Sequence, residues 1–305
     1  MKPVASPAKR RKAFTIVELL TVMSIIVILI GLLIPALNKV KQYATNVKQS
    51  AQFHSIDAAI ELFSNEFEGY PDSGAQDSTG AAYCGAMKLC EAIMGQDLLG
   101  VHANTVFRRD GLDASGNNDY YPTMSSTGTP SAAQANNLKA RKGPYLQPEN
   151  ANAYRMEDIY TDPGSQGFLP ETFVLCDVYG RKTANGLKTG MPILYYKANT
   201  AYSQHDPTIS MTSTDNAGNI YNYLDNESLL LQGKPWDPST TATPHELSAA
   251  GTEGVDRFYR NTQSDKIVTT PRPFNADKFI LISAGYDGEY GTADDVCNFD
   301  WKYQD

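Results

Sequence analysis

The sequence predicts an α+β protein, in which one long N-terminal helix precedes a small antiparallel-sheet head with long loop insertions. An unbroken apolar run covers residues 14–37, and apolar residues then recur with helical spacing as far as Phe67. Short β-type runs follow much later, within sequence rich in Gly, Pro and Tyr. A long helix followed by a few strands is the element order of an α+β fold. The sequence predicts a basic leader (residues 1–13) and a helix with a transmembrane half (14–37) and an outer half (38–68). The head follows as residues 69–305.

Composition is ordinary for a globular protein, but the charges are unevenly placed. Apolar residues make up 41% and charged residues 20% of the 305 residues, and the formal net charge is −8. Five of the 26 basic residues precede Phe14, so the chain without residues 1–13 has 21 basic and 34 acidic residues, a net charge of −13. A surface of this sign repels phosphate, which disfavours binding to nucleic acid.

The apolar run FTIVELLTVMSIIVILIGLLIPAL contains a single ionisable side chain, Glu18. About 20 apolar residues in a helix span the hydrocarbon core of a bilayer, so the run is long enough to cross a membrane. The basic cluster before it should stay on the cytoplasmic side, which places the body outside the cytoplasm.

Two other interpretations of this segment are a cleaved secretory signal and a plain signal anchor. A secretory signal has an apolar region of about 7–15 residues before a small-residue cleavage site, and the run here is longer. A plain signal anchor fits the length but leaves Glu18 unexplained. An acidic residue within a span costs roughly 2.5–3.5 kcal/mol, so it usually has a partner and a task.

The segment K-A-F-T-I-V-E-L-L resembles the processing site of type IV pilins and type II secretion pseudopilins, with Glu18 at the fifth position after the cut. The resemblance implies cleavage between Ala13 and Phe14 by a prepilin peptidase, followed by N-methylation of Phe14. It also implies assembly roles for Glu18 and Pro35. One departure is Ala13, because the family prefers Gly before the cut.

The chemistry of the new amino terminus agrees with this resemblance. Cleavage before Phe14 exposes an α-amino group with a reference pKa of ~7.7–8.0, which is largely charged. Glu18 lies one helical turn away, where its carboxylate can meet the ammonium of its own chain or of a neighbour. Desolvation of that pair in a filament would favour the correct register over a slipped one.

The helix should continue beyond the membrane. Apolar residues at spacings of 3, 4, 3 and 4 form one stripe: Phe53, Ile56, Ile60, Phe63 and Phe67. Polar positions are expected at Lys39, Lys41, Lys48, Gln49 and Glu61. Pro35 should kink or locally melt the helix, and the Gly69–Tyr70–Pro71 turn should end it. The half before the stripe would pack on other subunits, and the striped half would carry its own head.

The head is predicted to be loop-rich. Residues 73–82 and 110–137 are typical of loops, and residues 86–99 of a short helix. Strands are expected at 173–179, 193–198 and 278–284.

Several phrases in the head resemble the major (G-type) pseudopilin of type II secretion. These are Gly69–Pro71, Gly143–Leu146, Asp177–Arg181 and Pro192–Tyr196, which occur in the order of that family's Y-P, G-Y-L and D-P-W-G-x-P-Y elements. Val178 and Tyr179 depart from the pattern, and the chain is about twice the family's usual length. Residues 72–140 and 199–275 are therefore interpreted as insertions in a pilin-like fold.

A carboxylate-rich loop follows the last predicted strand. Its glycines allow tight turns, and its aspartates supply the hard oxygen ligands that calcium prefers. The loop resembles the calcium loop of major pseudopilins, S-x-G-x-D-G…D-D-I-x-N-W, which Asn298 and Trp301 echo. The resemblance implies calcium ligands at Ser283, Asp287, Asp294 and Asp295. The alternative is an acidic turn held by Asx hydrogen bonds. A second Asp-rich loop, residues 110–119, is a weaker calcium candidate.

The four cysteines, Cys84, Cys90, Cys176 and Cys297, form an even set that is compatible with two disulfides in an oxidising compartment. Free buried thiols are the open alternative. The four histidines are scattered and match no metal or catalytic motif, and no nucleotide-binding or hydrolase motif occurs, so no enzymatic activity is expected.

The resemblance implies a processed, single-pass protein of the bacterial inner membrane with its body in the periplasm, assembling into a filament that supports secretion. Its partners would be copies of itself, other pseudopilins, the prepilin peptidase and the inner-membrane assembly platform. The alternative function is a minor pilin that displays an adhesive or substrate-binding module, with the insertions as its recognition surface.

Overall fold

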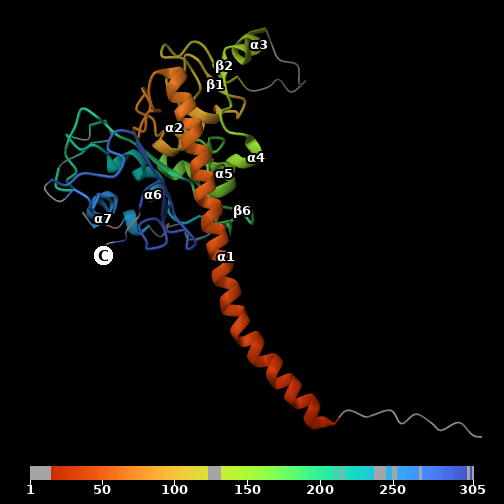
Figure 1. The fold of residues 1–305 in the computed structure, drawn as a ribbon. Coiled ribbons are helices and arrows are strands. Elements are labelled where there is room, and N and C mark those ends of the chain that lie inside the picture. Colours follow the sequence, from red (N-terminus) through yellow and green to blue (C-terminus); the bar gives the residue numbers. More distant parts are fainter. Residues whose placement is uncertain are drawn as a thin grey trace, which may run out of the picture. The chain divides into compact units, whose positions relative to one another are not determined.

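The computed structural model describes residues 15–122, 132–209, 211–212, 214–215, 217–236, 245–248, 253–267, 270–300 and 303. The chain divides into two compact units, residues 1–44 and 45–305. Helix α1 (Ile16–Phe67) begins in the first unit and ends in the second. The layout is broadly α+β, with a long apolar N-terminal helix followed by small antiparallel sheets joined by loops, as the sequence predicts (Figure 1).

Within the first unit, α1 is an exposed apolar helix. The whole helix has 52 residues and is not interrupted at Pro35, so the expected local melting does not occur. The large apolar side chains between Ile16 and Leu37 are all exposed to solvent. In the part of the chain that the structure describes, α1 is the one helix long and apolar enough to cross a membrane.

Within the second unit, α1 buries the predicted stripe. Phe53, Ile56, Ile60 and Phe63 are buried, and Phe67 stacks on Phe63 with ring centroids 4.3 Å apart. The stripe belongs to one buried cluster with residues of α2 (Gly85–Met94).

The prediction for Gln49 was wrong. Gln49 was expected on a polar face, but its side chain is 0% exposed, and Gln52 beside it is also buried. The two amides bond to the main chain of the body: Gln52 Nε2 donates to the carbonyl of Cys176 at 2.9 Å, and Gln49 Oε1 accepts from the amide of Val178 at 3.0 Å. The buried face of α1 is therefore wider than its apolar residues indicate.

A left-handed residue ends α1 where the sequence predicts a turn. Glu68 has φ 59°, and the amide of Gly69 donates to the carbonyl of Ser64 at 3.2 Å. This six-to-one bond after a left-handed residue is the Schellman arrangement, although that residue is usually Gly.

The principal sheet has three antiparallel strands in the order β7-β8-β9: Leu194–Lys197, Phe279–Ser283 and Val296–Cys297. Tyr195 pairs with Leu281, and Ser283 pairs with Val296. Three two-stranded ladders complete the sheets: β1 (Val101–His102) with β2 (Arg141–Lys142), β3 (Ala153–Arg155) with β4 (Phe173–Leu175), and β5 (Arg181–Lys182) with β6 (Lys188–Thr189). The three predicted strands thus exist as β4, β7 and β8, and the first is shorter than expected.

The remaining elements are short helices: α3 (Ala132–Lys139), α4 (Pro148–Ala151), α5 (Met156–Ile159), α6 (Glu227–Leu231) and α7 (Glu253–Thr262), with 3₁₀ turns η1 (Pro163–Gln166), η2 (Tyr223–Asn226) and η3 (Glu246–Ser248). Helix α3 lies in a segment predicted to be loop. Helix α2 ends at Met94, earlier than predicted, because Gly95 leaves the helix with φ 82°.

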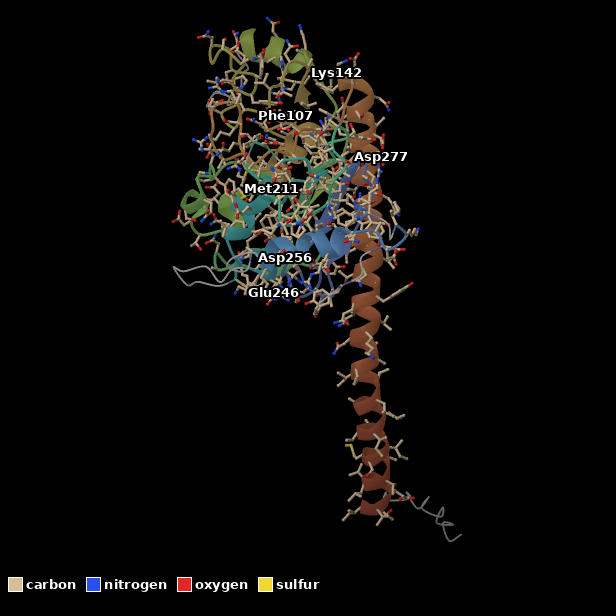
Figure 2. The ribbon with its side chains drawn as sticks, turned by 90° about the vertical axis from the view of Figure 1, so that its left-hand side faces the viewer. Phe107, Lys142, Met211, Glu246, Asp256 and Asp277 are labelled. Carbon is tan, nitrogen blue, oxygen red and sulfur yellow. The ribbon has the colours of Figure 1, made fainter. Side chains whose placement is uncertain are left out.

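The segments interpreted as insertions contribute to the core. One buried cluster joins Tyr83 and Met87 of the first segment to Tyr223 and Phe258 of the second, and both pack against strands of the sheets. Phe107, labelled in Figure 2, contacts this cluster and also the cluster beneath α1. The described parts of residues 72–140 and 199–275 therefore contribute to the core of the second unit.

All four cysteines carry free thiols in this structure, which is the alternative left open by the sequence. Cys84, Cys90 and Cys176 are buried, whereas Cys297 is partly exposed. Burial raises the pKa of the Cys84 thiol to about 11, so this cysteine is protonated and unreactive at neutral pH.

Candidate functional site

The first residues of α1 form a capping box around Glu18. The amide of Glu18 donates to Thr15 Oγ1 at 3.2 Å, while Glu18 Oε2 accepts from the Thr15 amide at 2.9 Å. These reciprocal bonds satisfy two donors that the first helical turn leaves unpaired. Within one chain, Glu18 therefore has a local partner that the sequence prediction overlooked, although the signal T-x-x-E is present at Thr15–Glu18.

The acidic loop connects β8 to β9. Pairing of Ser283 with Val296 closes its neck, so the loop is the turn of a hairpin rather than a tail after the last strand. Gly285 has φ 63°, and a Cβ there would lie 2.2 Å from the carbonyl oxygen of Asp294. Glycine is therefore required for the two arms of the loop to approach each other.

The close approach brings together two of the four predicted calcium ligands. The amide of Asp287 donates to Asp294 Oδ2 at 2.9 Å. Partial burial, and after it the neighbouring Asp294 carboxylate, raises the pKa of Asp287 to about 6. Although burial opposes it, hydrogen bonds from Thr292 and from the main chain of Asp287 hold the pKa of Asp294 below its usual value. This pair of adjacent carboxylates is the arrangement that a divalent cation neutralises.

The other two predicted ligands have different partners. Asp295 is buried and accepts from the Gly291 amide at 2.8 Å, and this burial raises its pKa well above the ordinary value. The Ser283 hydroxyl donates to Asp177 at 2.8 Å. Among the described residues, no three His, Cys, Asp or Glu side chains converge as a metal-binding group. Calcium here would therefore depend on Asp287 and Asp294, supplemented by carbonyl oxygens and water.

Asp177 contacts the acidic loop, although the sequence did not predict this contact. Its Oδ1 accepts from the amides of Tyr179 and Met191, both at 3.1 Å, and its Oδ2 accepts from Ser283. Complete burial raises the pKa of Asp177 to about 7. Gly190 makes room for it, because a Cβ there would lie 2.4 Å from Asp177 Oδ1. No spacing in the sequence could have revealed a contact between residues 106 positions apart.

These hydrogen bonds connect the acidic loop to α1. From Ser283 they pass to Asp177, and the next residue, Val178, donates its amide to Gln49 of α1. One residue further, the Tyr179 hydroxyl donates to Asn46 Oδ1 at 2.6 Å. The acidic loop and α1 therefore contact the same short segment, Asp177–Tyr179.

The second Asp-rich loop satisfies its own charges. Asp110 pairs with Arg108 at 2.7 Å. Asp113 accepts from the amide of Asn117 at 2.9 Å and from Ser115 Oγ at 2.8 Å. Because the loop's own groups engage these carboxylates, nothing in its geometry favours calcium over a simple Asx turn.

Three residues of the sequence prediction, Ala13, Phe14 and Trp301, lie outside the described residues. The processing site therefore rests on the sequence. Comparison of the chain with protein-family models, with curated proteins and with solved structures gives no match.

Proposed function

We propose that this chain is a structural subunit of a type II secretion pseudopilus or of a related type IV pilus-like filament. In this proposal the prepilin peptidase removes residues 1–13, and Phe14 becomes the methylated N-terminus. The apolar part of α1 holds the subunit in the inner membrane, with its body in the periplasm. Copies of α1 then pack together, with other pseudopilins and the assembly platform, into a filament that supports secretion.

The observation that carries the proposal is the combination of an exposed apolar helix with one acidic residue. Residues 16–37 bury no large apolar side chain within this chain. Such a surface needs lipid or copies of the same helix to cover it. A simple anchor has no need of an acidic residue within its apolar run. A helix that passes from lipid into a filament can use Glu18 as a pairing group.

The capping box describes how Glu18 can be held before assembly. In the single chain its carboxylate is occupied by Thr15. In a filament, the charged amino group of a neighbouring Phe14 would be a stronger partner, because both members of that pair carry a charge. Exchange of a local partner for one on another chain would link helix capping to assembly.

Assembly is tested by producing the full chain together with a prepilin peptidase and an assembly platform. We expect sheared material to contain thin filaments built from this chain. Detergent-soluble protein with no filaments, under conditions in which a known pseudopilin assembles, would contradict the proposal.

We further propose that the acidic loop takes calcium, with Asp287 and Asp294 as its carboxylate ligands. The ion would replace the repulsion between the two carboxylates with a clamp across the loop. Through Ser283 and Asp177, the same clamp would steady the contact with Gln49 of α1.

Calcium is expected to raise the melting temperature of the full chain in detergent micelles. A hundredfold excess over the dissociation constant adds roughly 2.7 kcal/mol to the free energy of unfolding. That gain corresponds to an increase of roughly 5–10 °C for a body of this size. The pKa of Asp287 is raised to about 6, so its proton is retained below that pH and competes with the ion. The increase should therefore be larger at about pH 8 than at about pH 5.

The matched variants are Asp294→Asn, which removes one ligand, and Asp162→Asn, which alters an exposed aspartate elsewhere. Asp294→Asn should lose the calcium response, and Asp162→Asn should keep it. If the wild-type melting temperature is the same with calcium and with a chelator, the loop is only an acidic turn.

A further inference from the structure

A polar cavity in the described part of the body lies where the chain leaves α1. It has a volume of about 520 Å³. Its walls come from residues 72–76 after the helix, from the end of β7 with the residues that follow, and from the segment that leads into η2. The segment for which the sequence showed no motif contributes five lining residues: Asn199, Thr200, Thr214, Asn222 and Asp225.

The lining of this cavity is hydrophilic. Among the described residues that line it, Ala198 supplies the single apolar side chain. The lining includes acceptors, donors and groups that serve as both: Asp72, Gln76, Lys197, Asn199 and Asp225.

Four ionisable side chains lie in or beside the cavity: Asp72, Lys88, Lys197 and Asp225. Asp72 forms an ion pair with Lys88, whose Nζ also donates to the carbonyl of Gln76 at 2.9 Å. Although burial opposes it, the Lys88 ammonium holds the pKa of Asp72 below its usual value. Lys197 adds a second ammonium group and Asp225 a second carboxyl group to the lining. Because Asp72 and Lys88 neutralise each other, Lys197 supplies the charge that remains when Asp225 is protonated.

Asp225 is the most unusual group in the lining. Its side chain is 5% exposed, and Ser73 Oγ donates to its Oδ2. Burial, and after it the carboxylate of Asp72, raises the pKa of Asp225 to about 8. At neutral pH most of this group is a carboxylic acid, which can donate as well as accept a hydrogen bond.

The cavity is held in place by bonds to the sheet and to α2. Ser73 Oγ accepts from the amide of Lys197 at 3.0 Å, which fixes the segment after α1 against β7. Behind Asp225, Asn226 Nδ2 donates to the carbonyl of Tyr195 at 2.8 Å, and its Oδ1 accepts from the Ala86 amide at 3.0 Å. A site fixed in this way does not need to be ordered by its ligand.

The segment beside the cavity is also attached to α7. The Tyr259 hydroxyl donates to the carbonyl oxygen of Tyr221 at 2.8 Å, and its oxygen also lies 2.8 Å from Met211 Sδ. Met211 is labelled in Figure 2 and marks this segment on the body. The wall is thus part of the packed structure rather than a detached loop.

We propose that this cavity binds a neutral, hydroxyl-rich ligand with the chemistry of a carbohydrate unit. Its volume lies within the roughly 300–1,000 Å³ of small-molecule sites. A lining that offers both donors and acceptors matches hydroxyl groups, which also donate and accept. This inference goes beyond a filament role, because it gives the body a recognition function that does not require assembly.

The nearest alternative ligand is an amine, which the carboxyl groups of Asp72 and Asp225 would attract. A neutral ligand needs hydrogen bonds but no carboxylate charge. Asp225→Asn keeps the size of the side chain, one acceptor and a donor, but removes its ability to ionise. This substitution should therefore leave binding of a neutral sugar within about threefold and should abolish binding of an amine.

The test is ligand-observed NMR on the full chain in a detergent without a sugar headgroup. The probes are glucose, galactose, mannose and N-acetylglucosamine at millimolar concentration, with butylamine as the cationic probe. We expect saturation transfer to at least one sugar and none to butylamine. Lys197→Met should weaken sugar binding about tenfold, because one hydrogen bond to a charged donor is lost. Lys182→Met, at an exposed strand lysine outside the cavity, should not change it.

Circular dichroism and the melting temperature of each variant distinguish a loss of binding from a loss of folding. Saturation transfer from the wild-type protein is measured without any variant. The proposal is overturned if no sugar gives a signal, if butylamine binds in place of sugars, or if folded Lys197→Met binds as the wild type does. Because purified protein is used, failure here leaves the filament proposal intact, and failure of assembly leaves this result intact.

Discussion

Glu18→Gln is expected to abolish filament formation while leaving the protein inserted in the membrane. Glutamine can take the place of glutamate in a capping box, so the bonds to Thr15 can be kept. What the substitution removes is the negative charge. If that charge pairs with the amino terminus of a neighbouring subunit, its loss leaves a buried ammonium without a partner, at a cost of about 3–5 kcal/mol per contact. Such a cost is repeated at every subunit, so sheared filaments should be undetectable.

Two further substitutions separate the charge from the cap. Glu18→Val removes both and should also prevent assembly. Thr15→Val removes the hydroxyl that accepts from the Glu18 amide but keeps the carboxylate, so filaments should still form. If Glu18→Gln assembles normally while Thr15→Val does not, Glu18 acts as a helix cap and the proposed pairing is wrong.

Ile60→Ala is expected to destabilise the body strongly. Ile60 is 0% exposed and belongs to the cluster that α1 forms with α2 and the sheet. Truncation of a buried isoleucine to alanine costs about 2–5 kcal/mol, from lost transfer free energy and from the cavity left behind. Urea unfolding of the full chain in micelles, followed by tyrosine fluorescence, should show the midpoint moving to a markedly lower concentration.

The matched control is Leu62→Ala, two residues away on the same helix. Leu62 is 52% exposed, so its truncation should change the free energy of unfolding by about 0.5 kcal/mol or less. Equal effects from the two substitutions would show that this part of α1 does not pack on the body as described.

Periodicity predicted α1 well because its signal is local and long. The spacing of Phe53, Ile56, Ile60 and Phe63 identified the buried face, and the end of the helix was predicted correctly. Gln49 was misplaced because a buried glutamine is explained only by the distant amide of Val178 that it bonds. A pattern of apolar residues cannot reveal a polar side chain that is buried for its hydrogen bonds.

The body was predicted less completely for the same physical reason. Strands β4, β7 and β8 were recognised from local β-type runs, but β9 is two residues long and exists through its pairing with β8. The segments called insertions gave no repeated pattern, yet Tyr223 and Phe258 from one of them are core residues. Burial in short, irregular elements depends on contacts between distant parts of the chain, which one sequence does not display.

The acidic loop was also predicted only in part. Its glycines and aspartates predicted a tight turn with carboxylates close together, and Asp287 and Asp294 do lie together. The sequence did not show that Asp295 turns toward Gly291 or that Ser283 bonds Asp177. Residue types indicated the chemistry, and tertiary contacts decided which side chains can take part in it.

The most direct test of a pilin-like subunit is the intact mass of the protein extracted from membranes that contain a prepilin peptidase. We predict a chain that begins at Phe14, without residues 1–13, and carries one additional methyl group at its N-terminus. A mass equal to the full sequence, with no modification at Phe14, would contradict processing and with it the proposed route to assembly.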